Sequence, residues 1–268
     1  MQYLRAFIKL GIFLLVTILL YSMIMFCLAG SIFGLNYEKY RGYLLKTWGR
    51  WSCYVLGIKI EVDGPVPDPP FMLVSNHLSY ADVFVLFSQL RGLFVAKSDV
   101  KAWPLIGFIV KTCGILFIDR NRKRDVKRVN ELISKNINQN QGVIIFPEGT
   151  TSPGISILNF RTSLLEYPAS VNLPVSYVAI SYQTDSPVAP AYQSVCWWGD
   201  DSFFGHFLKL LKLKSISCTL NYGEQKIVDD DRKELAIELN KAVQHVFEPV
   251  ISVDDFEEKH GTFKPLTF

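Results

Sequence analysis

The chain has 268 residues, of which 49% are hydrophobic and 20% are charged, and its formal net charge is only +3. This length and apolar content are enough to bury one substantial core, so one catalytic domain with an appended segment is expected. The charge balance selects no partner by itself. The five cysteines are scattered without a Cys-x-x-Cys pair, which argues against a disulfide framework or a zinc site and favours reduced thiols in a cytosol-like compartment.

An uncharged segment runs from Leu10 to Asn36, and its first part, Leu10 to Ala29, is almost wholly apolar. At about 1.5 Å per residue, roughly 20 helical residues match a hydrocarbon core of about 30 Å. A cleaved signal peptide is the alternative, because Arg5 and Lys9 precede the run, but its apolar region would normally hold about 7–15 residues. We therefore expect a retained membrane segment.

Basic residues flank this segment on both sides, and positive charge marks the cytoplasmic side of a membrane span. From Tyr37 to Val55, apolar residues recur at three- and four-residue spacing with basic residues between them, which is typical of an amphipathic interfacial helix. Two arrangements fit: a helical hairpin that dips into one leaflet, or a single span followed by a helix packed on the soluble domain. The hairpin is favoured slightly. Residues 1–57 are expected to be the membrane anchor and residues 58–268 the catalytic domain.

After residue 64, short apolar runs alternate with helix-length segments. The runs expected to be strands are 71–75, 93–96, 114–118, 143–146, 175–182 and 216–222. The expected helices are 82–90, 105–113, 124–138 and 229–247. This alternation predicts an α/β fold with a mostly parallel sheet flanked by helices, preceded by an N-terminal membrane-embedded helix or helical hairpin.

The first chemically informative segment is 75–82 (Ser-Asn-His-Leu-Ser-Tyr-Ala-Asp), where an apolar run gives way to a polar turn. His77 can act as a general base on an alcohol, and Asp82 can hold its imidazole in the required tautomer. Positioned proton transfer of this kind contributes on the order of 10²–10⁴ in rate. Residues 79–82 also fit a capping box, in which Asp82 serves the N-terminus of the next helix. The two roles are compatible.

A second carboxylate, Glu148, lies on a Pro/Gly turn directly after the apolar run 142–146. Two strand ends that both carry ionisable groups indicate one site at one edge of a sheet. The sequence does not support an acyl-enzyme intermediate, because it has no Gly-x-Ser-x-Gly elbow and no cysteine near His77. The four histidines form no cluster typical of a metal site. We therefore expect the acceptor substrate to supply its own hydroxyl nucleophile.

A third strand end finishes with Arg120, which opens a cluster of basic residues that continues to residue 128. An arginine at a strand end suits bidentate binding of a phosphate. The rest of the cluster is interpreted as a solvated helix face. It lacks the aromatic interleaving or recognisable module that would indicate nucleic-acid binding.

Together these segments resemble the first three motifs of the glycerolipid acyltransferase family, whose best-known members acylate lysophosphatidic acid. The matching residues are His77-x4-Asp82, the segment 114–120 (Gly-x-x-Phe-Ile-x-Arg) and the segment 146–150 (Phe-Pro-Glu-Gly-Thr), in the family's order and spacing. The resemblance covers roughly residues 71–182. It implies that His77 is the base and Asp82 its partner.

The resemblance also implies roles for the remaining motif residues. Arg120 and the turn of Glu148, Gly149 and Thr150 would hold the phosphate and glycerol region of the acceptor. The acyl donor would be a thioester, either acyl-CoA or acyl carrier protein, used as a co-substrate in direct transfer. Neither a metal nor a resident cofactor is expected.

The sequence departs from the family pattern in two places, both expected near the acceptor site. Many members carry arginine directly after Glu-Gly-Thr, where this chain has Thr151 and Ser152, and Tyr177 stands where the fourth motif usually has a second proline. A neighbouring branch acylates lyso-ornithine lipid, and the Thr151-Ser152 variant, with the segment 197–200 (Trp-Trp-Gly-Asp), is similar to it. Arg161 is a candidate compensating cation, and an ordinary surface arginine is the equally open interpretation.

The leading hypothesis is thus a membrane-bound lysophospholipid O-acyltransferase that acylates the free hydroxyl of 1-acyl-glycerol-3-phosphate. Its catalytic domain is expected on the cytoplasmic side, with the acceptor lipid taken from the bilayer. The alternatives are lyso-ornithine lipid as the acceptor and a catalytically silent protein that keeps the fold and binds membrane lipid. A lipid hydrolase would need a resident nucleophile. The sequence gives no indication of oligomeric state or chain-length preference.

Overall fold

A computed structural model of the protein describes residues 2–103, 106–119 and 122–263. Its strands are β1 (Ile58–Asp63), β2 (Met72–Ser75), β3 (Gly92–Lys97), β4 (Leu116–Ile118), β5 (Gly142–Ile145), β6 (Val175–Gln183) and β7 (Ile216–Tyr222). Its α-helices are α1 (Gln2–Gly30), α2 (Tyr37–Leu56), α3 (Ala81–Gln89), α4 (Ile106–Thr112), α5 (Lys123–Asn136), α6 (Glu166–Ser170), α7 (Ala191–Ser194), α8 (Phe203–Lys212), α9 (Arg232–Val246) and α10 (Val253–His260). Short 3-10 turns lie at η1 (Ser31–Phe33), η2 (Ser98–Ala102) and η3 (Thr162–Leu164).

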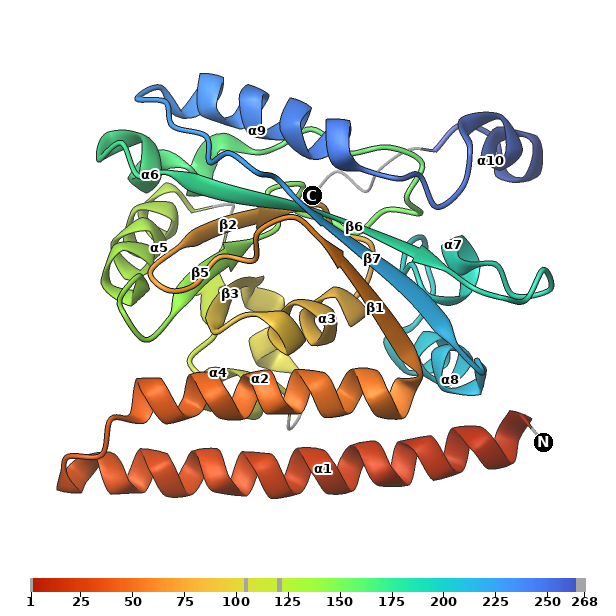
Figure 1. Ribbon diagram of the computed structural model, residues 1–268, viewed down its shortest axis with the longest axis horizontal. Helices are drawn as coiled ribbons and strands as arrows, with labels where there is room; N and C mark the ends of the chain where they lie inside the picture. Colours follow the sequence, from red (N-terminus) through yellow and green to blue (C-terminus); the bar gives the residue numbers. More distant parts are fainter. Residues whose placement is uncertain (1, 104–105, 120–121, 264–268) are drawn as a thin grey trace.

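The strands form one sheet in the order β1-β7-β6-β2-β5-β3-β4 (Figure 1). Neighbouring strands are parallel except β6 and β7, which are antiparallel. The carboxyl ends of β2, β3, β4 and β5 therefore meet at one edge, where open α/β sheets bind their ligands. The predicted α/β fold with a mostly parallel sheet is confirmed.

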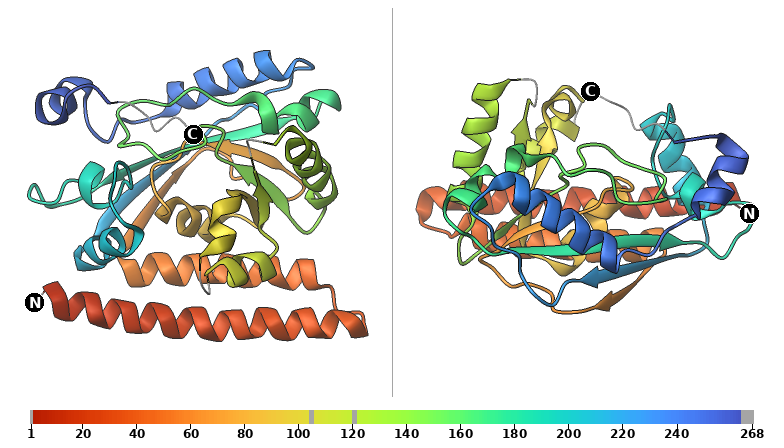
Figure 2. Two further views of the ribbon diagram at one scale, coloured as in Figure 1. Left: turned by 180° about the vertical axis from the view of Figure 1, so that it is seen from behind. Right: turned by 90° about the horizontal axis from the view of Figure 1, so that it is seen from above.

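Helices cover both faces of the sheet, as the views in Figures 1 and 2 show. Side chains alternate along β2, and both faces of this strand are buried. Met72 packs with α5 and α9 on one face, and Leu73 packs with α3 on the other. Both side chains are completely buried. A strand covered on both faces reads as a continuous apolar run, which is why its position was predictable from the sequence.

The N-terminal helices α1 and α2 form a hairpin that lies beneath α3 (Figure 1). By length and composition α1 could cross a membrane, and only 6% of its most apolar 18-residue window is buried. The ring of Phe13 on α1 contacts Trp48 of α2, Phe84 of α3 and Phe207 of α8, with centroids 5.5 to 6.3 Å apart. Helix α1 thus packs against α2, α3 and α8.

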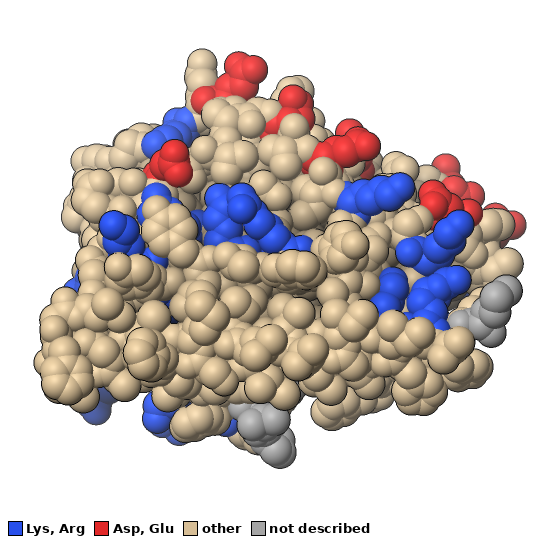
Figure 3. Space-filling model, turned by 60° about the horizontal axis from the view of Figure 1, so that its bottom comes forward, with Lys and Arg blue, Asp and Glu red and all other residues tan. Residues whose placement is uncertain are grey.

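The outer face of this hairpin is apolar. Figure 3 shows a broad surface without charged side chains, bordered by lysine and arginine. The exposed large apolar residues of α1 include Tyr3, Leu4, Phe7, Ile8, Ile12, Leu15, Ile18, Leu19, Met23 and Phe26. Such a contiguous apolar patch marks a surface that meets another apolar phase.

Helix α2 meets α3 both through Trp48, whose ring lies 5.2 Å from that of Phe84, and through a close backbone approach at Gly49. A Cβ atom on Gly49 would lie 2.5 Å from the backbone nitrogen of Ser88 and 2.7 Å from the carbonyl carbon of Phe87, so only glycine allows this approach. Trp51, which the sequence places at the membrane interface, is 48% exposed. Because α2 shares its core with α3, the division of the chain at residue 57 remains a prediction.

The predicted elements form, with differences at their ends. The strand expected from residue 114 begins at Leu116, because Gly114 adopts a left-handed turn with φ of 82°. The helix expected from residue 229 begins at Arg232, because Asp231 caps it through the backbone nitrogens of Lys233 and Glu234. Strand β1 and helices α6, α7, α8 and α10 were not predicted.

Candidate active site

His77 lies on the turn between β2 and α3, and Asp82 lies in the first turn of α3. The Nδ1 atom of His77 is 2.8 Å from Oδ2 of Asp82. The same oxygen accepts hydrogen bonds from the backbone nitrogens of Leu78 and Ser79 at 2.8 and 3.0 Å. The bond from the Ser79 nitrogen is one half of a capping box, and the Ser79 hydroxyl accepts from the backbone nitrogen of Ala81 at 3.2 Å. One carboxylate therefore has the geometry for both predicted roles, orienting the imidazole and capping the helix.

The second ring nitrogen of His77 is directed away from Asp82. Because a carboxylate accepts the bond at Nδ1, that nitrogen carries the proton and Nε2 carries the lone pair. The His77 side chain is 21% exposed, whereas Asp82 is fully buried. Phe146 stacks on the imidazole, with ring centroids 4.0 Å apart and an interplanar angle of 11°. Among the described residues none hydrogen-bonds to Nε2, so this nitrogen is available to a substrate hydroxyl.

The other oxygen of Asp82 accepts a hydrogen bond from a side chain of the sheet. The hydroxyl of Tyr182, on β6, donates to Oδ1 of Asp82 at 2.8 Å. Both residues are completely buried. The carboxylate therefore has four hydrogen-bond donors, and its two oxygens are divided between the imidazole side and the sheet side.

Asn76 fixes the register of the turn that carries His77. Its side-chain amide donates to the carbonyl oxygen of Ile180 at 2.9 Å, and its side-chain oxygen accepts from the backbone nitrogen of Ile180 at 2.7 Å. The side chain extends the pairing of β2 with β6 beyond Ser75, where the backbone ladder ends. This pairing sets where His77 leaves the sheet.

Glu148 lies directly beside this turn. Its Oε2 atom accepts from the backbone nitrogen of His77 at 3.1 Å, and its Oε1 atom accepts from the backbone nitrogen of Leu158 at 3.0 Å. The predicted meeting of the two strand ends is therefore confirmed. In this structure the carboxylate bonds to backbone, so its position beside His77 is fixed before any acceptor binds.

Burial has a strong effect on the charge of Glu148. Loss of water contact raises the pKa of its carboxyl to about 8, although the two backbone bonds oppose this rise. The nearby charge of Asp82 raises the pKa further. At neutral pH a large part of Glu148 is therefore protonated and able to donate a hydrogen bond.

Three of the remaining predicted binding residues lie at the turn that contains Glu148, and the fourth is not described by the structure. Gly149 adopts φ of 79° and closes the turn by donating to the carbonyl of Phe146 at 3.1 Å, and Thr150 follows, half-buried. The backbone nitrogen of Arg161 donates to the carbonyl of Pro147 at 2.9 Å, which brings Arg161 to the same turn. No hydrogen bond or ion pair joins its guanidinium to another described residue. Arg120 lies outside the described residues.

The two departures from the family pattern separate in space. The backbone nitrogen of Ser152 donates to the carbonyl of His77 at 3.1 Å, so Thr151 and Ser152 lie at the site as expected. Tyr177 packs on Gly223 and on the core that contains α9, across the sheet from Tyr182. Tyr177 and Tyr182 point to opposite faces because side chains alternate along β6, and a role of Tyr177 at the acceptor site stays a prediction.

Sequence reasoning missed two residues that support the segment from His77 to Asp82, namely Tyr182 and His206. Tyr182 gave no signal beyond its place at a strand end. Tyr80 bonds to Nδ1 of His206 on α8 at 2.9 Å, and His206 Nε2 lies 3.0 Å from the carbonyl of Cys196. Burial lowers the pKa of His206, in keeping with a neutral ring that bridges the two. The pairs are far apart in the sequence, so no local pattern indicates them.

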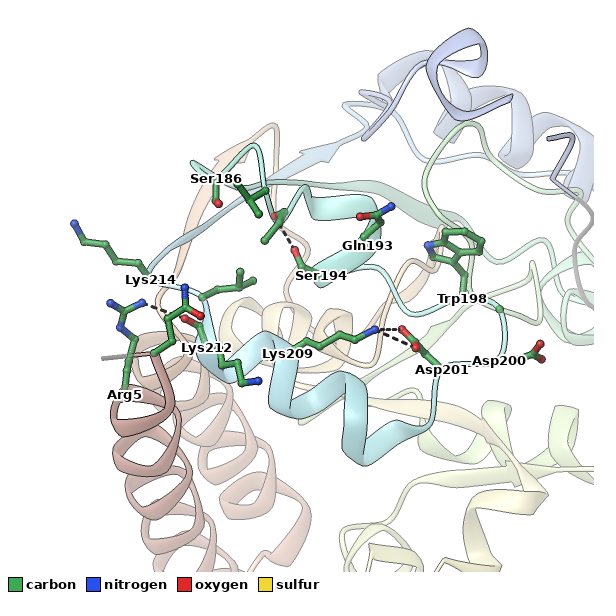
Figure 4. Close-up of a pocket in the computed structure, with 15 residues that line it drawn as sticks. Arg5, Ser186, Gln193, Ser194, Trp198, Asp200, Asp201, Lys209, Lys212 and Lys214 are labelled. Atoms are coloured by element: carbon green, nitrogen blue, oxygen red, sulfur yellow. Dashed lines mark hydrogen bonds and ion pairs between the residues drawn. The ribbon is translucent and has the colours of Figure 1, made fainter. Parts of the chain in front are cut away.

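A pocket of about 850 Å³ is shown in Figure 4. It is bounded by Arg5 near the start of α1, by α8 and by the loop that contains Trp198. The Lys209–Asp201 ion pair, 2.8 Å long, spans part of it. The adjacent Trp197 donates to the carbonyl of Leu78 at 2.8 Å, but His77 does not line the cavity.

Comparison with known proteins identifies the family. The sequence model of the family described as Acyltransferase matches residues 58–190. The chain is 32% identical to the lyso-ornithine lipid O-acyltransferase of Rhizobium meliloti over 76% of this chain and 73% of that one. It is 30% identical to the 1-acyl-sn-glycerol-3-phosphate acyltransferase of Neisseria gonorrhoeae over 60% and 66%, respectively.

The fold is also found in a solved structure. The crystal structure of the 1-acyl-sn-glycerophosphate acyltransferase PlsC of Thermotoga maritima is similar with a TM-score of 0.62, at 19% identity, over 91% of this chain and 97% of that one. At this identity the likeness concerns the fold. The sequence matches go further, and they establish that the chain belongs to the acyltransferase family, among enzymes of lipid biosynthesis.

Proposed function

We propose that the protein transfers a fatty acyl group from an acyl thioester to the free hydroxyl of a membrane lysolipid, with His77 as the general base. The observation that carries this proposal is the 2.8 Å pair of His77 Nδ1 and buried Asp82, which leaves Nε2 accessible. Asp82 holds the tautomer and stabilises the imidazolium that forms.

The reaction proceeds by direct transfer. Nε2 of His77 takes the proton of the acceptor hydroxyl as its oxygen attacks the thioester carbonyl carbon. The tetrahedral intermediate then collapses, the C–S bond breaks, and the imidazolium returns the proton to the leaving thiolate. Burial raises the pKa of the Cys196 and Cys218 thiols well above the ordinary range, which makes both poor nucleophiles and favours direct attack.

The first acceptor to consider is 1-acyl-glycerol-3-phosphate. Arg161 lies at the Glu148–Gly149 turn with its guanidinium unpaired among the described residues, and a phosphate is the partner that an arginine fork suits best. Protonated Glu148 can donate to an acceptor oxygen beside it. The Neisseria relative is named for this acceptor.

Lyso-ornithine lipid is the second candidate, favoured by two observations. Thr151 and Ser152 stand against the His77 carbonyl where many relatives carry arginine, so the site has one cation fewer at that point. The relatives named lyso-ornithine lipid O-acyltransferase from Rhizobium meliloti and Pseudomonas aeruginosa also match larger shares of this chain, 76% and 79%.

The deciding assay offers membranes that contain the protein a labelled acyl thioester with each lysolipid in parallel. Acyl-CoA and acyl carrier protein are supplied as donors in separate reactions. Product with only one acceptor identifies the head group, and product with only one donor identifies the carrier. No product from folded protein with any combination supports the lipid-binding alternative.

The role of His77 is tested by His77→Ala. We expect turnover to fall on the order of 10²–10⁴-fold at unchanged expression, because positioned proton transfer is lost. His245→Ala, which alters an exposed histidine on α9, is the matched control and keeps full activity. Turnover retained in His77→Ala contradicts the mechanism.

We further infer that α1 and α2 lie in one leaflet as a hairpin, with the catalytic domain on the cytoplasmic side. In support, Lys9 on α1 donates to the carbonyls of Leu56 and Leu213 at 2.6 and 2.9 Å, at the ends of α2 and α8. A membrane-spanning α1 would have to leave these partners. Labelling of single cysteines placed at residues 2 and 35 tests this: both should react from the cytoplasmic side, and opposite sides would contradict it.

A further inference from the structure

The Asp82 carboxylate has one donor that comes from a side chain other than the imidazole. Two of its four hydrogen bonds come from the backbone nitrogens of Leu78 and Ser79, and a third comes from His77. The fourth is the hydroxyl of Tyr182 at 2.8 Å from Oδ1. This bond is therefore the one that a sequence change can remove while the imidazole and the turn stay in place.

The position of Tyr182 is built into the strand pair that carries the site. Asn76 bonds both backbone groups of Ile180, two residues before Tyr182 on the same face of β6. The segment that presents the imidazole and the residue that holds Asp82 are thus fixed to each other across β2 and β6. Tyr182 is completely buried among core residues, so its ring has a fixed place.

The hydroxyl of Tyr182 stays protonated under working conditions. Burial, and then the negative charge of Asp82, raises its pKa well above the ordinary range. The other ionisable groups near the carboxylate are the thiols of Cys196 and Cys218, whose pKa values burial also raises, and the carboxyl of Glu148. None of these is a hydrogen-bond donor to Asp82 in the described structure, so the phenol has no substitute.

We propose that Tyr182 is a positioning residue for acyl transfer, which acts on His77 through Asp82. Its hydroxyl holds Oδ1, so that Oδ2 remains directed at Nδ1 of His77. It also withdraws charge from the carboxylate, so that the imidazolium releases its proton to the leaving thiolate more readily. This inference rests on the proposed function, in which His77 is the base.

The test is Tyr182→Phe, which keeps the buried ring and removes only the hydroxyl. Tyr222→Phe is the matched control: Tyr222 lies on neighbouring β7, is 4% exposed, and has a buried hydroxyl with no hydrogen-bond partner among the described residues. Both variants are compared with the wild type by circular dichroism and thermal unfolding, so that a folding defect is recognised.

We expect kcat of Tyr182→Phe to fall about tenfold, since hydrogen bonds to charged groups are worth that factor or more. KM for both substrates should stay within about twofold, because the residue touches neither substrate. The acidic limb of the kcat/KM profile should move to higher pH by about half a unit, because the less neutralised carboxylate binds the imidazolium more strongly. Tyr222→Phe should match the wild type in all three measurements.

A double-variant cycle separates action through Asp82 from a general effect on the core. In the Asp82→Asn background, adding Tyr182→Phe should change kcat less than about twofold. An equal loss in both backgrounds, or equal behaviour of Tyr182→Phe and Tyr222→Phe, overturns the inference. If His77→Ala is inactive and Tyr182→Phe is unchanged, this inference alone fails. If His77→Ala is active, the proposed function and the inference fail together.

Discussion

The backbone nitrogen of His77 donates a hydrogen bond to Oε2 of Glu148 at 3.1 Å, across a sequence separation of 71 residues. The bond joins the end of β2 to the turn after β5. The other oxygen of Glu148 accepts from Leu158, which draws in the loop beyond. Glu148 therefore holds together the segments that form the site, in addition to any contact with an acceptor.

Glu148 should give the protein a characteristic dependence of stability on pH. Its folded-state pKa is about 8, against 4.5 without the fold, so the folded form keeps a proton that the unfolded form has lost. Stability therefore falls as pH rises between these values, by at most about 1.4 kcal/mol per pH unit. The measurement is the thermal midpoint of detergent-solubilised protein across this window.

Glu148→Gln is the companion variant. It cannot ionise, so its midpoint should lack this component of the pH dependence. Its amide accepts only one of the two backbone donors, and we expect a loss of about 1–3 kcal/mol at the acidic end of the window. A wild-type profile as flat as that of the variant would contradict the assignment of a raised pKa.

Arg161 should matter for a phosphate-bearing acceptor. Arg161→Gln keeps much of the side-chain length and removes the charge. We expect KM for 1-acyl-glycerol-3-phosphate to rise about 10- to 100-fold, because a charge-assisted bond to phosphate is lost. Arg124→Gln, on the exposed face of α5, serves as the control and should leave KM unchanged. Equal kinetics for the two variants would identify Arg161 as an ordinary surface residue.

The contact between α2 and α3 should tolerate no Cβ at Gly49. Gly49→Ala places that atom within 2.8 Å of three backbone atoms of α3. Overpacking of this kind costs about 1–3 kcal/mol, and backbone atoms cannot rotate away as side chains do. Gly11→Ala on α1 is the matched control, since its Cβ would have no neighbour within 4 Å. Thermal unfolding should show a lower midpoint for Gly49→Ala and an equal or higher one for Gly11→Ala.

The attachment of α1 should depend on Lys9, whose amine serves the carboxyl ends of α2 and α8 together. Lys9→Met keeps the apolar stem and removes the donor. We expect faster hydrogen exchange in the first turns of α1 and a loss of about 1–3 kcal/mol. Lys39→Met, exposed at the start of α2, is the control. Unchanged exchange in Lys9→Met would mean that apolar packing alone holds the helix.

The parts of the fold that were predictable are those with a strong local pattern. β2 and β5 are buried on both faces and read as short apolar runs, and the residues with chemistry follow directly after them. Strand β1 was not predicted, because it lies at the sheet edge and alternates apolar and charged residues, as in Ile58, Lys59 and Ile60. Its pattern is that of a half-exposed strand, which a search for continuous runs overlooks.

The site was predictable in its motif residues and not in their supports. The spacing of His77 and Asp82 is local, so one turn brings them together. Tyr182 reaches Asp82 only because β6 lies next to β2 in the sheet, although β3, β4 and β5 lie between these two strands in the sequence. Strand order is a tertiary property, and single-sequence patterns contain no record of it.

The close contact of α2 with α3 has a mechanical consequence. Asp82 lies in the first turn of α3, and Gly49 brings the backbones of α3 and α2 together without intervening side chains. The distance between the imidazole and the apolar outer face of the hairpin is therefore constant. If this face meets the bilayer as proposed, the acceptor lipid has to bring its reactive hydroxyl to this fixed distance from the membrane.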